Sequence, residues 1–114
     1  MIVNSVIKSG GIMTLNDLQN YESVWRDPVK FKYKDLEIIS MSLPSSGGIL
    51  LGQMLKVIED YDIKSFGHNS VKTIQVLVEA ERRAYADRSY FMGDPDYMSL
   101  PVYELMDKNY VVDR

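Results

Sequence analysis

Residues 43–48 read Leu-Pro-Ser-Ser-Gly-Gly, and they separate a β-favouring part of the chain from a strongly helical part. Upstream, residues 29–33 alternate apolar side chains with lysines, which is the period of a strand with one buried face. A second β-favouring run follows at residues 37–41, after a tight turn at Lys34-Asp35. The pattern predicts an antiparallel hairpin that leads into the 43–48 corner.

Downstream of this corner, apolar residues recur at helical spacing from Leu50 to Tyr61 and predict a helix that frays near Asp62. Gly52 lies inside this helix at a cost of about 1 kcal/mol relative to alanine, and a close approach of another element would offset that cost. Residues 65–69 are expected to form a loop.

A second long helix is predicted from about Val71 to Tyr90, with Ser70 as its N-cap and residues 93–95 as its end. Its outer face carries acidic and basic side chains four residues apart, so ion pairs are expected there between Glu79 and Arg83 and between Arg83 and Asp87. The predicted inner stripe consists of Ile74, Leu77, Val78, Ala84 and Tyr85.

The remaining elements are short. Residues 1–9 suit the last turns of a helix, which Gly10-Gly11 ends, and Thr14 with Asp17 predicts a capping box at the start of a helix that ends near Tyr21. A last short helix is expected over 102–109. The sum is an α+β chain, mostly helical with one β-hairpin, expected to form a single domain over residues 1–114.

Composition limits the class of function. The chain has 114 residues, 46% hydrophobic and 25% charged, which is typical of a globular protein, and its net charge is −3. Without a basic block, nucleic-acid binding is not expected. There is no cysteine, so disulfide and thiolate chemistry are excluded. No apolar run reaches the roughly 18–20 residues of a membrane span, and the first residues do not form a signal peptide; any export signal would lie outside these residues.

Three segments could carry chemistry, each with a simpler structural alternative. The Ser45–Gly48 corner opens a helix and could bind an anion, or it could serve only as a cap and flexible corner. Asp87-Arg88 could bind a carboxylate substrate, or form an ion pair that fixes the helix end. Asp94-Pro95-Asp96 offers too few oxygens for calcium and is better explained as a capping turn. His68, the only histidine, lies in a Gly-His-Asn turn, and nothing places it near the serines as a catalytic base.

The order and spacing of several motifs resemble the γ-glutamyltranspeptidase family. The resemblance runs from about Ser5 to Tyr110, and Leu43 departs from it where the family often carries proline. The segments that carry it are Gly10–Thr14, Asp17-Leu18, Tyr21, Ser42–Gly48, Glu79–Ser89 and Gly93–Asp96.

The resemblance implies an N-terminal-nucleophile hydrolase with a layered αββα fold, made as a precursor that cleaves itself into a large and a small subunit. The new N-terminal threonine of the small subunit would attack γ-glutamyl amides such as glutathione and pass the γ-glutamyl group to water or an amine. This chain resembles the late, C-terminal part of the large subunit. Its partners would then be the remainder of the large subunit and the catalytic small subunit, and it would be periplasmic or secreted if the parent follows the family.

No catalytic, substrate-binding or metal-binding residue carries over from the family to this chain, and no cofactor is expected. A threonine nucleophile activated by its own amine must be a chain terminus, whereas Thr14 and Thr73 are internal. Ser45-Ser46 and Arg88 do not match the motifs of the family's serine pair or of its carboxylate-binding arginine. Two alternatives stay open: a self-standing module that binds an anion or small acid, and a segment of a related acylase or poly-γ-glutamate transferase.

Overall fold

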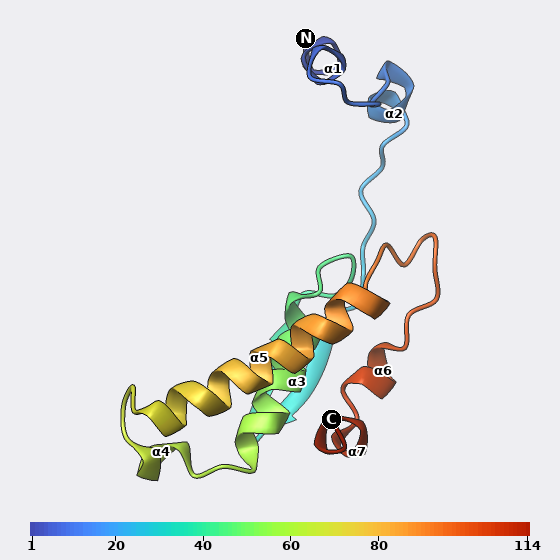
Figure 1. The fold of residues 1–114 in the computed structure, drawn as a ribbon. Coiled ribbons are helices and arrows are strands. Elements are labelled where there is room, and N and C mark those ends of the chain that lie inside the picture. The colour runs from blue at the N-terminus through green and yellow to red at the C-terminus, as the bar shows by residue number, and fades with distance from the viewer.

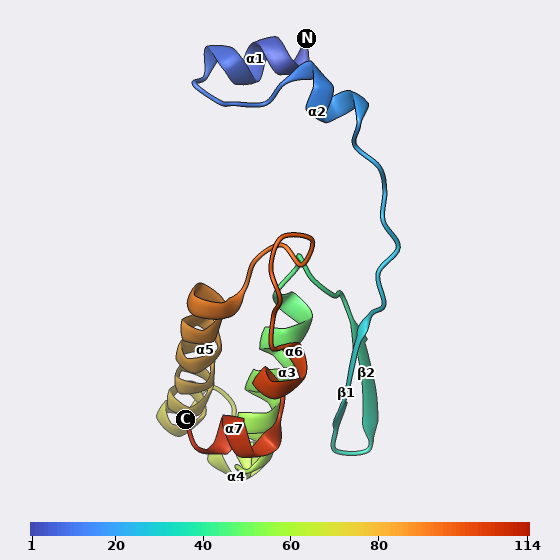
Figure 2. The same cartoon turned by 90° about the vertical axis from the view of Figure 1, so that its right-hand side faces the viewer.

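The computed structural model describes residues 1–114 and consists of an elongated body and an N-terminal arm, as Figures 1 and 2 show. It is α+β and mostly helical with one hairpin, so the predicted fold class is confirmed. The elements in chain order are α1 (Ile2–Lys8), α2 (Leu15–Gln19), β1 (Val29–Tyr33), β2 (Leu36–Ser40), α3 (Gly47–Glu59), α4 (Ile63–Phe66), α5 (Val71–Phe91), α6 (Val102–Leu105) and α7 (Lys108–Val112).

The predicted hairpin is present as a two-stranded antiparallel sheet. Its register pairs Val29 with Ser40 and Tyr33 with Leu36, and the turn between them places Lys34 at a positive φ of 54°. Val29 and Phe31 are buried while Lys30 and Lys32 are exposed, as the alternation predicts. One face of the hairpin therefore packs on the helices and the other is open.

Helix α3 lies at the centre of the body, with the hairpin on one side and α5 on the other (Figure 2). A Cβ at Gly52 would lie 3.2 Å from Met106 Sδ and 3.4 Å from the Phe31 ring, so the glycine allows both to approach α3 closely. The core cluster joins the hairpin, α3 and the α6 region through Val29, Phe31, Leu43, Ile49, Leu105 and Met106.

Helix α5 was placed correctly by the sequence, but its predicted inner stripe was wrong for four of the five residues. Only Ala84 of that stripe is buried, whereas Ile74, Leu77, Val78 and Tyr85 are exposed. The face toward α3 carries small and polar side chains instead: Thr73, Ala80, Ala84 and Asp87. Because Ala80 and Ala84 are small, the two helices can pack closely, and the large apolar side chains point away from the body.

Two smaller expectations need correction. The expected loop at 65–69 is partly helical, because Asp62 caps the short helix α4 through the backbone N–H of Ser65. The expected helix at 102–109 is two helices, because Asp107 leaves the helical conformation and caps α7. The helix opened by Thr14 ends at Gln19 with Asn20 as its C-cap, close to the expected end near Tyr21.

The arm, residues 1–28, comprises α1, α2 and an extended linker (Figures 1 and 2). Neither arm helix contains a buried residue. Gly10 ends α1 with a φ of +81°, and the predicted capping box is present: Thr14 N–H donates to Asp17 Oδ2 at 2.7 Å, and Asp17 N–H donates to Thr14 Oγ1 at 3.2 Å. No helix of the protein has the length and apolar character needed to cross a membrane.

Candidate functional site

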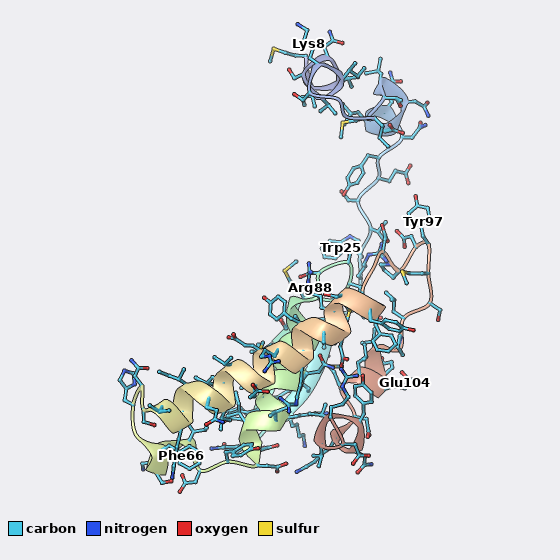
Figure 3. The ribbon with its side chains drawn as sticks, viewed as in Figure 1. Lys8, Trp25, Phe66, Arg88, Tyr97 and Glu104 are labelled. Atoms are coloured by element: carbon cyan, nitrogen blue, oxygen red, sulfur yellow. The ribbon has the colours of Figure 1, made fainter.

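The structure brings together two segments that the sequence singled out separately. Arg88, near the end of α5, donates from Nε to Ser46 Oγ at 3.1 Å, beside the start of α3. In the corner itself the Leu43–Pro44 bond is cis, and Ser45 N–H donates to the Ser42 carbonyl at 3.2 Å. Figure 3 shows Arg88 on the upper part of α5, toward the end at which α3 begins.

This contact gives the start of α3 a positive character. Ser46 occupies the N-cap position but makes no side-chain cap bond, and Gly47 N–H donates to Ser45 Oγ at 3.4 Å. The helix dipole and an exposed guanidinium both favour an anion here. Arg88 does not activate Ser46 as a nucleophile, because arginine keeps its proton in proteins and cannot act as a base.

His68 is exposed in the loop between α4 and α5. In Figure 1 this loop lies at the opposite end of α3 from the Ser46 corner. The structure therefore does not bring His68 to either serine.

Asp87 is the most buried charged side chain and lies between α3 and α5, with only 3% of its surface exposed. Gln53 Nε2 donates to Asp87 Oδ2 at 2.7 Å, and an Arg114 guanidinium nitrogen lies 2.8 Å from Oδ1. The predicted Arg83–Asp87 pair is absent, because Arg83 pairs with Glu79 at 2.7 Å. Asp87 and Arg88 contact different partners, so these two adjacent residues do not form an ion pair with each other.

Tyr110, on α7, completes this buried cluster. Arg114 Nη1 donates to the Tyr110 hydroxyl at 3.0 Å, and burial together with the carboxylate of Asp87 raises the pKa of Tyr110. The Oε1 atom of Gln53 is buried and has no donor. The cluster thus joins α3, α5 and α7 through polar contacts.

Sequence reasoning missed Gln53, Tyr110 and Arg114 as members of this cluster. One signal was available: Gln53 follows the buried Ile49 by four residues, so it occupies an inward position of α3 where an apolar residue is normal. A polar side chain at such a position needs a partner, and Asp87 is that partner.

The Asp94–Asp96 turn forms an ion pair with the arm rather than a cation site. Arg26 Nη2 lies 2.6 Å from Asp96 Oδ2, and this hydrogen bond lowers the pKa of Asp96. Asp94 Oδ1 accepts from the Asp96 backbone N–H at 3.0 Å, as in a capping turn. No group of three or more metal-binding side chains gathers here or elsewhere in the protein.

The two threonines have structural roles. Thr14 belongs to the capping box of α2. Thr73, buried in the first turn of α5, donates from Oγ1 to the Gly67 carbonyl at 2.8 Å. Neither has a free α-amine, so neither can act as an N-terminal nucleophile in this chain.

The fold is a mostly helical body with one hairpin, and the residues described above form no nucleophile–base pair. A family model described as Gamma-glutamyltranspeptidase matches residues 1–114, and the chain belongs to that family. Over 109 residues it is 41% identical to a glutathione hydrolase proenzyme of Escherichia coli. This alignment covers 96% of this chain and 19% of the relative. It is 40% identical over 106 residues to the acylase ACY 1 proenzyme of a Pseudomonas species, covering 93% of this chain and 19% of the relative.

Solved structures agree with this assignment. The γ-glutamyltranspeptidase of Helicobacter pylori superposes with a TM-score of 0.85 at 46% identity, covering 96% of this chain and 32% of that one. A cephalosporin acylase from Bacillus halodurans, with a TM-score of 0.79 at 22% identity, shares the fold. The chain spans about a fifth of the length of the curated relatives it matches, and these relatives are larger proenzymes.

Proposed function

We propose that these residues form a structural segment, in the late part of the large subunit, of an enzyme that cleaves γ-glutamyl amides such as glutathione and transfers the γ-glutamyl group to water or amines. The observation that carries the proposal is the family match over residues 1–114, together with 46% identity to a solved γ-glutamyltranspeptidase. Fold alone does not fix chemistry, so the family match carries more weight than the likeness in shape.

In this proposal the segment is a scaffold. It supplies no catalytic, substrate-binding or metal-binding residue, and the N-terminal threonine nucleophile comes from polypeptide outside these 114 residues. Its partners are the remainder of the large subunit and the small subunit. The buried cluster around Asp87 supports this role, because its contacts are used to hold helices together.

The test has two parts. The purified chain is incubated with a chromogenic γ-glutamyl anilide, and no turnover above background is expected. The chain then replaces the matching segment of the H. pylori relative, and this hybrid is expected to process itself and release the chromophore. Turnover that follows the isolated chain through purification, or a folded hybrid without activity, would contradict the proposal.

A related acylase is the second candidate, since the chain is 40% identical to an acylase proenzyme and 41% identical to a glutathione hydrolase proenzyme. These values are too close to separate the two. A full-length parent protein assayed with a γ-glutamyl anilide and with a β-lactam side-chain amide would distinguish them by the ratio of the two rates.

A self-standing module that binds an anion or small acid is the third candidate, and the Arg88–Ser46 contact favours it. Calorimetry of the isolated chain with glutamate, glutathione and phosphate tests this. Binding that is lost in Ser46→Ala with the fold intact supports the module, whereas absence of heat with all three ligands supports the scaffold.

A further inference from the structure

The contact between α3 and α5 leaves two buried acceptor atoms without a hydrogen-bond donor. Gln53 Nε2 donates to Asp87 Oδ2, but Gln53 Oε1, the other polar atom of that amide, accepts from no group. Asp87 Oδ1 also has no donor, because the Arg114 guanidinium lies 2.8 Å from it without hydrogen-bond geometry. Gln53 and Asp87 are only 4% and 3% exposed, so bulk solvent does not satisfy these atoms. Since buried acceptors are normally paired, a donor is expected at this point.

A small cavity lies at these two side chains. Its walls include Gln53 and Asp87, the small residues Ala80 and Ala84, and Tyr110. The cavity volume is about 10 Å³, at the lower end of the roughly 10–15 Å³ that one water molecule requires. The cavity therefore has room for a single water molecule and for no larger ligand.

We infer that this cavity binds one structural water molecule, which bridges α3 and α5. The water donates one hydrogen to Gln53 Oε1 and the other to Asp87 Oδ1, so it satisfies both acceptors at once. Apolar cavities stay dry, whereas a cavity that offers a water two or more polar partners is hydrated. A small cation is the competing ligand for two acceptors, but Arg114 already supplies the positive charge that Asp87 needs. The inference does not depend on the proposed function, since it uses only contacts within this chain.

The water explains why a glutamine occupies this inward position of α3. Its amide donates to Asp87 through Nε2 and accepts from the water through Oε1, so both polar atoms of the side chain are paired. The carboxylate is satisfied by the amide at Oδ2 and by the water at Oδ1, beside the guanidinium of Arg114. The polar contact between α3 and α5 is then complete without any group from outside the chain.

The alanines of the chain give a direct test, because they are Ala80, Ala84 and Ala86. Ala80 and Ala84 line the cavity and are each 1% exposed, whereas Ala86 is exposed on the same helix. The 114-residue chain is produced with carbon-13 in its alanine methyl groups, and nuclear Overhauser contacts between each methyl and the water resonance are measured, with and without ammonium chloride. Ala80 and Ala84 are expected to show the contacts of a long-lived bound water, and Ala86 only the weak contact of passing solvent. Ammonium is expected to change nothing.

Two matched variants identify the acceptor. Gln53→Met keeps the length of the side chain and removes Oε1 from the cavity, whereas Gln75→Met makes the same change at an exposed position of α5. Gln53→Met is expected to abolish the water contacts of Ala80 and Ala84, and Gln75→Met to retain them. Tyr110→Phe removes the one hydroxyl that lines the cavity, whose exchangeable hydrogen could imitate a water. The contacts are expected to remain in this variant.

Every other outcome contradicts the inference. Absence of water contacts at Ala80 and Ala84 would show a dry cavity, and equal contacts at all three alanines would show free access of bulk solvent. Contacts that disappear in Tyr110→Phe would assign the signal to the hydroxyl, and contacts that persist in Gln53→Met would exclude Oε1 as a partner of the water. Loss of the contacts on addition of ammonium would favour a cation site. If Gln53→Met does not fold, the comparison of the three alanines in the unchanged chain still decides.

Discussion

At the scale of single residues, Asp87 decides how three helices meet. A buried carboxylate is stable only when opposite charge and hydrogen-bond donors replace the water it loses. Gln53 supplies a donor and Arg114 supplies the charge, each from a different part of the chain. Because both partners are long side chains that reach inward, the carboxylate also fixes their conformations.

Asp87→Ala is expected to lower the free energy of unfolding by about 1–3 kcal/mol, since it leaves the buried amide of Gln53 without an acceptor, whereas the half-exposed guanidinium of Arg114 can turn to water. Asp87→Asn should cost less, because an amide oxygen can still accept from Gln53. Urea unfolding measures both. The control is Glu79→Ala, which breaks a solvent-exposed pair on the same helix and should cost less than about 1 kcal/mol. Equal losses for Asp87→Ala and Glu79→Ala would contradict the assigned role of Asp87.

The two adjacent glycines of the corner make a second matched test. A Cβ at Gly48 would collide with the backbone carbonyl of Met41, whereas a Cβ at Gly47 would meet only Ser45 Oγ at 3.5 Å. Gly48→Ala is expected to lower the free energy of unfolding by about 1–3 kcal/mol through this overlap. Gly47→Ala should leave it unchanged or raise it by up to about 1 kcal/mol. Thermal unfolding distinguishes the two, and equal midpoints would refute the close approach of α3 to Met41.

At the scale of elements, the sequence predicted what depends on local chemistry. The alternation over 29–33, the capping box of Thr14 and the N-cap at Ser70 are each determined within a few residues, and all three are present. The buried face of α5 depends instead on its neighbour α3. Because α3 and α5 pack closely, the small Ala80 and Ala84 lie in their interface. The larger Ile74 and Leu77, which were predicted to be buried from their hydrophobicity alone, are exposed.

In the candidate site, too, local features were predictable from the sequence and long-range contacts were not. Ser46 and Arg88 were both singled out from the sequence, but their contact spans 42 residues and required the packing of α3 on α5. Arg26 and Asp96 are 70 residues apart and carried no local sign of their pairing. Sequence patterns therefore identified which residues mark helix boundaries, whereas the partners of these residues came only from the tertiary structure.

The capping box of α2 makes a pH-dependent prediction for one element. The pKa of Asp17 is lowered, first by the Thr14 backbone N–H and then by the Thr14 hydroxyl, because both donate to the charged carboxylate. Since the pKa is lower in the folded helix, the cap contributes fully above the ordinary carboxyl pKa and is lost as the pH falls through the lowered value. Thr14→Ala keeps the N–H and removes the hydroxyl, so NMR titration of Asp17 should show its pKa rising only part of the way to normal. Identical titration curves for the two proteins would contradict a role for the hydroxyl.

At the scale of the whole molecule, the chain with its arm is more extended than a compact domain of the same length. Its radius of gyration is 18.5 Å, whereas a compact domain of this length would have about 13 Å. The buried hydrophobic cluster contains six residues, and large apolar side chains are exposed on the arm, on β2 and along α5. This shape is the one expected of a segment that shares its core with a larger protein.

The isolated chain is therefore expected to associate or to be only marginally stable, and the outer face of α5 should drive the association. Ile74, Leu77 and Val78 lie exposed on a single helix, so contact between copies removes apolar surface from water without any specific geometry. Light scattering should give an average mass that rises with concentration. Ile74→Lys combined with Val78→Lys should reduce this rise, because charge on the shared face opposes contact, whereas Val112→Lys on α7 should change it less. A monomer at all concentrations with a high melting temperature would contradict the expectation, since it would mean that the exposed face of α5 needs no cover and that the segment can stand alone.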